Sequence, residues 1–123
     1  MDTNTLIVAA CLILEAGGEG ERGMELVREV ICTRASERRM NEARVCLQRL
    51  QFSCFNGIDW HTAVEKAAKH PRWNLAVKLA GSKPLTDHTK RANHYCTVNI
   101  SPSWAKGRTP VLVHRNHKFY RIK

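Results

Sequence analysis

The stretch LIVAACLILEAGGE, residues 6–19, decides the fold. It opens with an uninterrupted apolar run, Leu6–Leu14, and Glu15 follows this run directly. A helix that is apolar on nearly every face belongs in the middle of a core, and Gly17-Gly18 is a pair that ends helices. Glu15 is therefore expected where a buried helix opens to solvent.

A carboxyl group in that position suits general acid catalysis. Apolar walls disfavour the ionised form of a carboxyl group, so the group can keep a proton at neutral pH and deliver it to a substrate. The alternative interpretation of the same pattern is that Glu15 is the first solvated residue after a core helix.

Helical patterns extend over the first two thirds of the chain. The predicted spans are about 5–16, 21–36, 42–50, 60–69 and 74–80, with Thr3 and Asn4 as capping candidates for the first span and Asp59 for the fourth. The second span is amphipathic and is expected to pack on the first. Its polar positions are expected on the side away from that contact: Arg22, Glu25, Arg28 and Glu29.

The last third of the chain changes character. Residues 82–123 predict loops and one small strand pair, formed by 109–114 and 118–122. A chain of 123 residues fits one domain, which we place at 1–123. The expected fold class is mainly α (α+β), a compact helical domain with a small strand- and loop-rich C-terminal part.

The charge and the cysteines narrow the function. A net charge of +9 predicts a polyanionic partner, with nucleic acid, an acidic glycan or cell wall, and an anionic membrane surface as alternatives. The five cysteines include no CxxC pair, which disfavours a structural zinc site and a complete disulfide framework. Cys11 and Cys32 are expected to be small buried hydrophobic residues. We expect no metal and no cofactor.

The N-terminus gives no sign of export. The run Leu6–Leu14 is too short to cross a bilayer, which takes about 20 residues. Met1–Thr5 also lacks the positive charges of a signal peptide. We expect synthesis in the cytoplasm without a signal peptide or a transmembrane segment, in a compartment that keeps thiols reduced.

The C-terminal third collects aromatic and hydrogen-bonding side chains that suit a binding cleft. They are His94, Tyr95, Trp104, His114, His117, Phe119 and Tyr120. Aromatic faces beside hydrogen-bonding groups suit sugar rings, and they also suit stacked nucleotide bases. Segments without strong secondary structure commonly display such residues for binding.

The order of short motifs resembles a known family. The motifs are Glu15-Ala16-Gly17-Gly18-Glu19, Thr33-Arg34, Gln51-Phe52-Ser53, Ala92-Asn93-His94-Tyr95, Pro102-Ser103-Trp104-Ala105 and His117-Lys118-Phe119-Tyr120-Arg121. Together, over about residues 12–121, they resemble the cell wall hydrolase family of the spore-cortex-lytic enzymes (SleB-like). Two positions depart from the family pattern, since Gly17 stands where an Arg is usual and Thr33 where an Asn commonly precedes Arg34.

The resemblance implies a lysozyme-like domain that cleaves the bond between N-acetylmuramic acid and N-acetylglucosamine in peptidoglycan, commonly as a lytic transglycosylase. It places the catalytic role on Glu15 and lines the cleft with Gln51, Phe52, His94 and Tyr95. The remaining substrate-binding candidates are Trp104, His117 and Tyr120.

Two mechanisms follow from the number of carboxylates. A lytic transglycosylase uses a single Glu as acid and then as base, and it forms a 1,6-anhydro product. A hydrolytic muramidase needs a second carboxylate, for which Glu19 is the nearest candidate. The glycines between Glu15 and Glu19 favour a helix-start or positioning role for Glu19, and hence the transglycosylase.

A basic, leaderless, single-domain member of this family looks like a phage endolysin or a virion-borne wall hydrolase. We expect a monomer that acts on the wall after release or delivery, with the anionic envelope surface as a further partner.

Two alternatives belong to other classes. A nucleic-acid-binding protein would explain the charge, but no helix-turn-helix, zinc finger or RNP-like string is present. A cysteine peptidase or amidase would use Cys54 or Cys96 with His94 or His114, and it lacks a local nucleophile signature.

Overall fold

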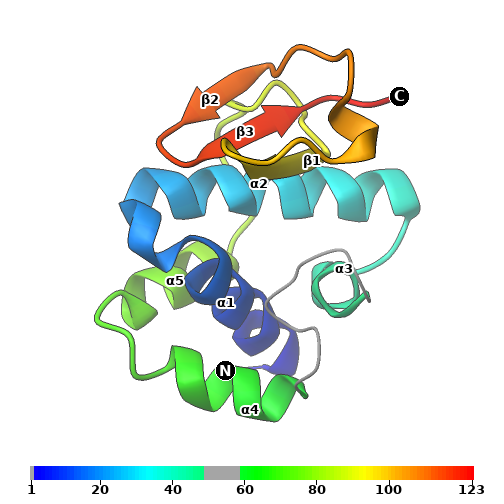
Figure 1. The fold of residues 1–123 in the computed structure, drawn as a ribbon. Coiled ribbons are helices and arrows are strands. Elements are labelled where there is room, and N and C mark those ends of the chain that lie inside the picture. Colours follow the sequence, from blue (N-terminus) through cyan, green and yellow to red (C-terminus); the bar gives the residue numbers. More distant parts are fainter. Residues whose placement is uncertain (1, 49–58) are drawn as a thin grey trace.

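The computed structural model describes residues 2–48 and 59–123 (Figure 1). Its elements are α1 (Thr3–Ala16), η1 (Gly17–Glu19), α2 (Gly20–Arg38), α3 (Glu42–Leu47), α4 (Trp60–Ala67), α5 (Trp73–Ala80), β1 (His94–Thr97), η3 (Ser103–Ala105), β2 (Leu112–His114) and β3 (His117–Tyr120). The predicted class, mainly α with a small α+β part, is confirmed.

Helix α1 is the centre of the helical layer, as its apolar run predicts. Every residue from Ile7 to Ile13 is buried, and α1 packs against α2, α3, α4 and α5. The predicted caps Thr3 and Asn4 are wrong, because the Asp2 side chain accepts the Thr5 N–H at 2.7 Å and so caps the helix. The Asn4 side chain instead accepts the Ala43 N–H at 3.0 Å, at the start of α3.

The remaining helix boundaries follow local sequence signals. Asp59 caps α4 as predicted, since its carboxylate accepts the Thr62 N–H at 2.9 Å. Gly81 follows the last residue of α5, also as predicted. Helix α3 extends to Leu47, and the last two residues of its predicted span lie outside the described residues.

Helix α2 lies between two layers. Figure 1 shows the sheet on one side of α2 and the other helices on its opposite side. Met24, Val27 and Ile31 pack into the core around α1. Leu26 and Val30 pack against Phe119 of the sheet. Both apolar rows of α2 are therefore buried, each against a different layer.

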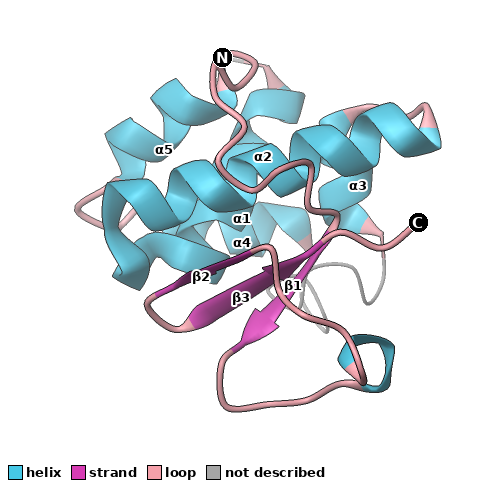
Figure 2. Cartoon of the chain, turned by 90° about the horizontal axis from the view of Figure 1, so that it is seen from above, coloured by secondary structure: helices cyan, strands magenta, loops and turns pink. Residues whose placement is uncertain are grey.

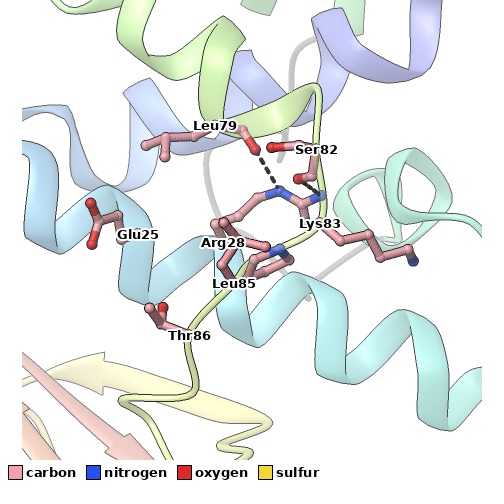
Figure 3. A pocket seen from close by; sticks show the side chains of 8 residues that line it. Glu25, Arg28, Leu79, Ser82, Lys83, Leu85 and Thr86 are labelled. Atoms are coloured by element: carbon pink, nitrogen blue, oxygen red, sulfur yellow. Dashed lines mark hydrogen bonds between the residues drawn. The ribbon is translucent and has the colours of Figure 1, made fainter.

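Arg28 and Glu29, which were predicted on the polar side of this helix, are also buried. They are only 2% and 3% exposed, because the chain from α5 to β1 covers the side of α2 on which they lie. The Arg28 guanidinium donates to the Leu79 carbonyl at 3.0 Å and to the Ser82 carbonyl at 2.8 Å (Figure 3), and it pairs with Glu42.

Glu29 is satisfied in the same way by the segment that covers it. Its carboxylate accepts the Thr89 N–H and the Thr89 hydroxyl, both at 2.9 Å, and the Thr86 hydroxyl at 2.7 Å. Buried charges need such partners, because a charge left unpaired in the interior is costly.

The sheet has the order β1-β3-β2, and both pairs are antiparallel (Figure 2). The predicted strand pair is confirmed as β2 and β3, although β2 starts later than its predicted span and β3 covers residues 117–120 in place of 118–122. Strand β1 was missed, because its four residues, His-Tyr-Cys-Thr, carry no clear alternation of apolar and polar side chains.

The register divides the sheet side chains between two faces. Tyr95, Leu112, His117 and Phe119 share the inner face, which packs on α2. His94, Cys96, Lys118 and Tyr120 share the opposite, outer face. Adjacent residues of one strand therefore serve different surfaces.

The cysteines that the structure describes are free thiols. Cys11 is buried, as predicted, and Cys32 is only partly buried. Cys54 lies outside the described residues.

Candidate active site

Glu15 lies in the last turn of α1, where the helix gives way to η1, and its side chain is partly buried. The Tyr95 hydroxyl of β1 donates to the Glu15 carboxyl oxygen Oε1 at 2.5 Å. A carboxyl group at the end of the central helix is therefore met by a phenol from the inner face of the sheet.

Tyr95 is held firmly where it meets Glu15. Its ring stacks on Phe119 with centroids 5.7 Å apart and meets the edge of His117 at 5.2 Å. Aromatic packing of this kind fixes ring orientation as well as burying area. The position of the Tyr95 hydroxyl is therefore set by the sheet core.

The start of β1 is anchored to α2 beside Tyr95. The Arg34 guanidinium donates to the Asn93 carbonyl at 2.6 Å. The buried Asn93 side chain accepts the Ile122 N–H at 2.9 Å and donates to the Ile122 carbonyl at 2.6 Å. These bonds give a structural reason for the Asn in the Ala92-Asn93-His94-Tyr95 motif, which the sequence did not reveal.

Glu19 lies on the same side of the molecule but has different partners. It is 8% exposed, and its carboxylate accepts the Asn116 backbone N–H at 3.0 Å and the Asn116 side-chain amide at 3.3 Å. His117 Nδ1 lies 3.4 Å from the same carboxylate. Glu19 thus ties η1 to the turn between β2 and β3.

Asn116 was not among the predicted site residues. Asn is frequent in turns, so the sequence could have suggested the turn. The contact with Glu19 spans 97 positions of the chain, which no local pattern encodes.

The charges of Glu19 and Glu15 both affect the pKa of His117. Burial lowers the pKa of His117 below its usual 6.5, while Glu19 and Glu15 offset part of this and His114 adds to it. The net lowering keeps the imidazole neutral at neutral pH, so His117 contributes a hydrogen-bonding ring to this cluster and no positive charge.

Gly17, the departure from the family pattern, is enclosed by the turn between α4 and α5. A Cβ atom added to Gly17 would lie 3.1 Å from the His70 ring, so a side chain has little room there. Arg72 comes from the same turn, and its guanidinium donates to the Gly17 carbonyl at 3.0 Å. His70 and Arg72, which the sequence did not single out, therefore fix the backbone that follows Glu15.

Three other predicted residues form a separate group on the outer face of the sheet. The His94 and Trp104 rings lie 4.9 Å apart, and the Trp104 and Tyr120 rings lie 5.3 Å apart. The structure thus brings Tyr95, His117 and Glu19 together around the end of α1, and it places His94, Trp104 and Tyr120 elsewhere. Gln51 and Phe52 lie outside the described residues.

The His94 ring lies in a positive environment. Burial, together with nearby Arg34, Arg38 and Arg108, lowers the pKa of His94 from 6.5 to about 4, and Glu37 opposes this only in part. His94 is therefore neutral at neutral pH.

Comparison with known proteins identifies the family. A model of the cell wall hydrolase family matches residues 18–120. The chain belongs to this family. Searches of curated proteins and of solved structures gave no match.

Membership implies that this cell wall hydrolase degrades peptidoglycan. The match begins at residue 18, so it does not include Glu15. Within residues 2–48 and 59–123, the hydrolase has no group of three or more His, Cys, Asp or Glu residues placed to hold a metal ion. The described helices also include none with the length and apolar character needed to cross a membrane.

The close packing of Glu19 against α2 of the hydrolase requires a glycine at position 23, and this requirement can be tested. A Cβ atom at Gly23 would overlap the Glu19 Cβ atom. In an ordinary helix interior, Gly→Ala stabilises by roughly 1 kcal/mol. Here we expect Gly23→Ala to lower the free energy of unfolding by about 1–3 kcal/mol, the usual cost of overpacking, in urea titrations. Gly18→Ala is the matched control, because a Cβ there meets nothing within 4 Å; an equal loss in both variants would contradict the prediction.

The lowered pKa of His94 predicts a pH dependence of stability. An unfolded histidine gains its proton near pH 6.5, whereas folded His94 gains it near pH 4. Between these values only the unfolded state is protonated, so stability falls as the pH drops through this window. NMR titration should find His94 near 4, and Arg108→Gln should raise that value. His94→Gln should reduce the slope of unfolding free energy against pH; an unchanged slope would contradict the assignment.

Proposed function

We propose that this hydrolase is a peptidoglycan glycosidase that cleaves the bond between N-acetylmuramic acid and N-acetylglucosamine, with Glu15 as the single catalytic carboxyl group. The observation that carries the proposal is the 2.5 Å hydrogen bond from Tyr95 to a partly buried Glu15. This contact orients the carboxyl group at the end of a rigid helix, and proton transfer in a transition state requires such orientation.

In the favoured mechanism Glu15 acts twice. It first protonates the glycosidic oxygen, while positive charge develops at C1 of the muramic acid. It then takes the proton of the C6 hydroxyl as that oxygen closes on C1, which leaves a 1,6-anhydro ring and a neutral sugar hydroxyl as leaving group. One carboxyl group suffices because it returns to its protonated state.

The contacts of Glu19 support this mechanism over direct hydrolysis. A second catalytic carboxylate must face the substrate or a water beside it. Glu19 is instead buried, with its carboxylate directed to Asn116 and His117. These contacts fit a positioning role, in which Glu19 holds the β2–β3 turn and the His117 ring beside Tyr95.

We further propose that the enzyme is a lysozyme-like, phage-type endolysin that reaches the wall after release or delivery. Support comes from the net charge of +9, because attraction to an anionic envelope raises the rate of encounter. The same attraction should weaken as salt is added.

The role of Glu15 is tested by turbidity loss of permeabilised cells. We expect Glu15→Gln to slow lysis by at least about 100-fold, the lower range for general acid–base catalysis. Tyr95→Phe should slow lysis by roughly tenfold, because the carboxyl group loses the hydrogen bond that orients it. The matched controls Cys54→Ser and Cys96→Ser should lyse normally if no cysteine nucleophile acts. Full lysis by a folded Glu15→Gln variant would remove the glycosidase mechanism.

The chemistry is tested by mass spectrometry of muropeptides released from purified peptidoglycan. We expect 1,6-anhydro ends. A Glu19→Gln variant should release fewer fragments, because Glu19 holds neighbouring groups in place, but these fragments should carry the same ends because Glu19 is assigned no chemical step. Reducing ends from the wild-type enzyme would instead establish a hydrolytic muramidase.

A further inference from the structure

The outer face of the sheet borders a hollow whose lining is positively charged. The hollow has a volume of about 560 Å³ and lies between the segment around η3 and strand β3. The side chains that give it its chemistry are Ser101, Ser103, Lys106, Arg108, Lys118 and Tyr120. No acidic residue is among the described residues that line it. Three cations thus surround a space of the size that small ligands occupy in proteins.

Two of these cations are held in place by the backbone around the hollow. The Lys118 ammonium donates to the Ile100 carbonyl at 2.9 Å, and the Arg108 guanidinium donates through Nε to the Trp104 carbonyl at 2.9 Å. Each of these groups carries further N–H donors beyond the one in this bond. The fork of a guanidinium matches a carboxylate or a phosphate, and the two serine hydroxyls add neutral donors.

The surroundings of the hollow favour an anionic sugar polymer. Tyr120 lines the hollow, and its ring packs against Trp104, which is partly exposed. Arg34, Arg38 and Arg108 together disfavour a positive charge on nearby His94. The same positive potential attracts anions, and the partly exposed Trp104 ring beside the hollow suits the apolar side of a sugar ring.

We propose that this hollow is a second substrate site, which binds carboxylate or phosphate groups of a wall polymer and holds the enzyme on the wall. It lies on the sheet face opposite Tyr95, so the group bound there is remote from the bond that is cleaved. The inference rests on the proposed action on the wall, but it does not depend on the role of Glu15.

The test measures binding to insoluble walls by sedimentation, in the full-length Glu15→Gln protein so that the walls stay intact. We expect Lys106→Glu with Arg108→Glu to weaken binding at least about tenfold at roughly 0.05 M salt, the scale of losing one or two charge-assisted hydrogen bonds. The difference should shrink near 1 M salt, where charges are screened within about 3 Å. Lys106→Ala is a second variant that keeps the Arg108 bond to the Trp104 carbonyl.

The matched control is Lys66→Glu with Lys69→Glu, which makes the same change in net charge on exposed positions of and beside α4. We expect this control to weaken binding much less. An equal loss in both double variants would show a non-specific charge effect and would overturn the site. Undiminished binding in the folded Lys106 and Arg108 variants would also overturn it.

The source of the anionic group is found by changing the walls. Walls stripped of phosphodiester polymers by acid should lose the difference between wild type and variant if phosphate is the ligand. Glycan strands stripped of stem peptides should lose it if the ligand is a peptide carboxylate. Binding to a DNA duplex that the same variants abolish, with wall binding intact, would overturn the proposal in favour of nucleic acid.

The two proposals fail separately. In an otherwise wild-type background, the Lys106 and Arg108 variants should cleave short soluble glycan strands at the wild-type rate. Loss of that activity would mean that the hollow belongs to the catalytic groove, which would overturn its assignment as a second site. Rapid wall degradation by Glu15→Gln in the sedimentation test would refute only the proposed function.

Discussion

The structure depends on a single constraint, the burial of α2 between a layer of helices and a layer of strands. A helix covered on both sides leaves little surface for charged residues. Arg28, Glu29 and Arg34 therefore lie inside the protein, and each is matched by carbonyls, hydroxyls or an opposite charge from a distant segment. These bonds attach the segments around α5 and β1 to α2, so they fix where the sheet lies relative to the end of α1.

That placement assigns different tasks to two acids only four positions apart. Glu15 ends the central helix and meets the hydroxyl of Tyr95, which comes from the inner face of the sheet. Glu19 lies beyond the end of the helix, and its carboxylate contacts Asn116 and His117. Gly23 allows this arrangement, because a side chain there would displace Glu19. Gly23 thus lets the Glu19 carboxylate reach Asn116, where it becomes part of the scaffold.

Sequence patterns anticipated the features that are encoded locally. The apolar run around α1, the Asp59 cap and the Gly81 end each depend on residues within a few positions, and each was predicted. The burial of Arg28 and the strand β1 were not predicted, because both depend on segments that arrive from far along the chain. The family resemblance identified the hydrolase and singled out Glu15 and Tyr95. The supporting contacts of Asn93, Asn116 and Arg72 could not be predicted from the sequence, because they join residues that are far apart along the chain.

The candidate binding residues that cluster in the sequence separate in space, because a strand directs successive side chains to opposite faces. Tyr95 faces the helices and Glu15, while its neighbour His94 faces outward to Trp104. A single short strand therefore contributes to two surfaces, one with a carboxyl group and one with cations and aromatic rings. An enzyme that attacks an insoluble anionic polymer benefits from this division. Lys106, Arg108 and Lys118 surround a hollow beside the outer face, whereas Glu15 meets Tyr95 on the opposite face, so these cations do not pair directly with the Glu15 carboxyl group.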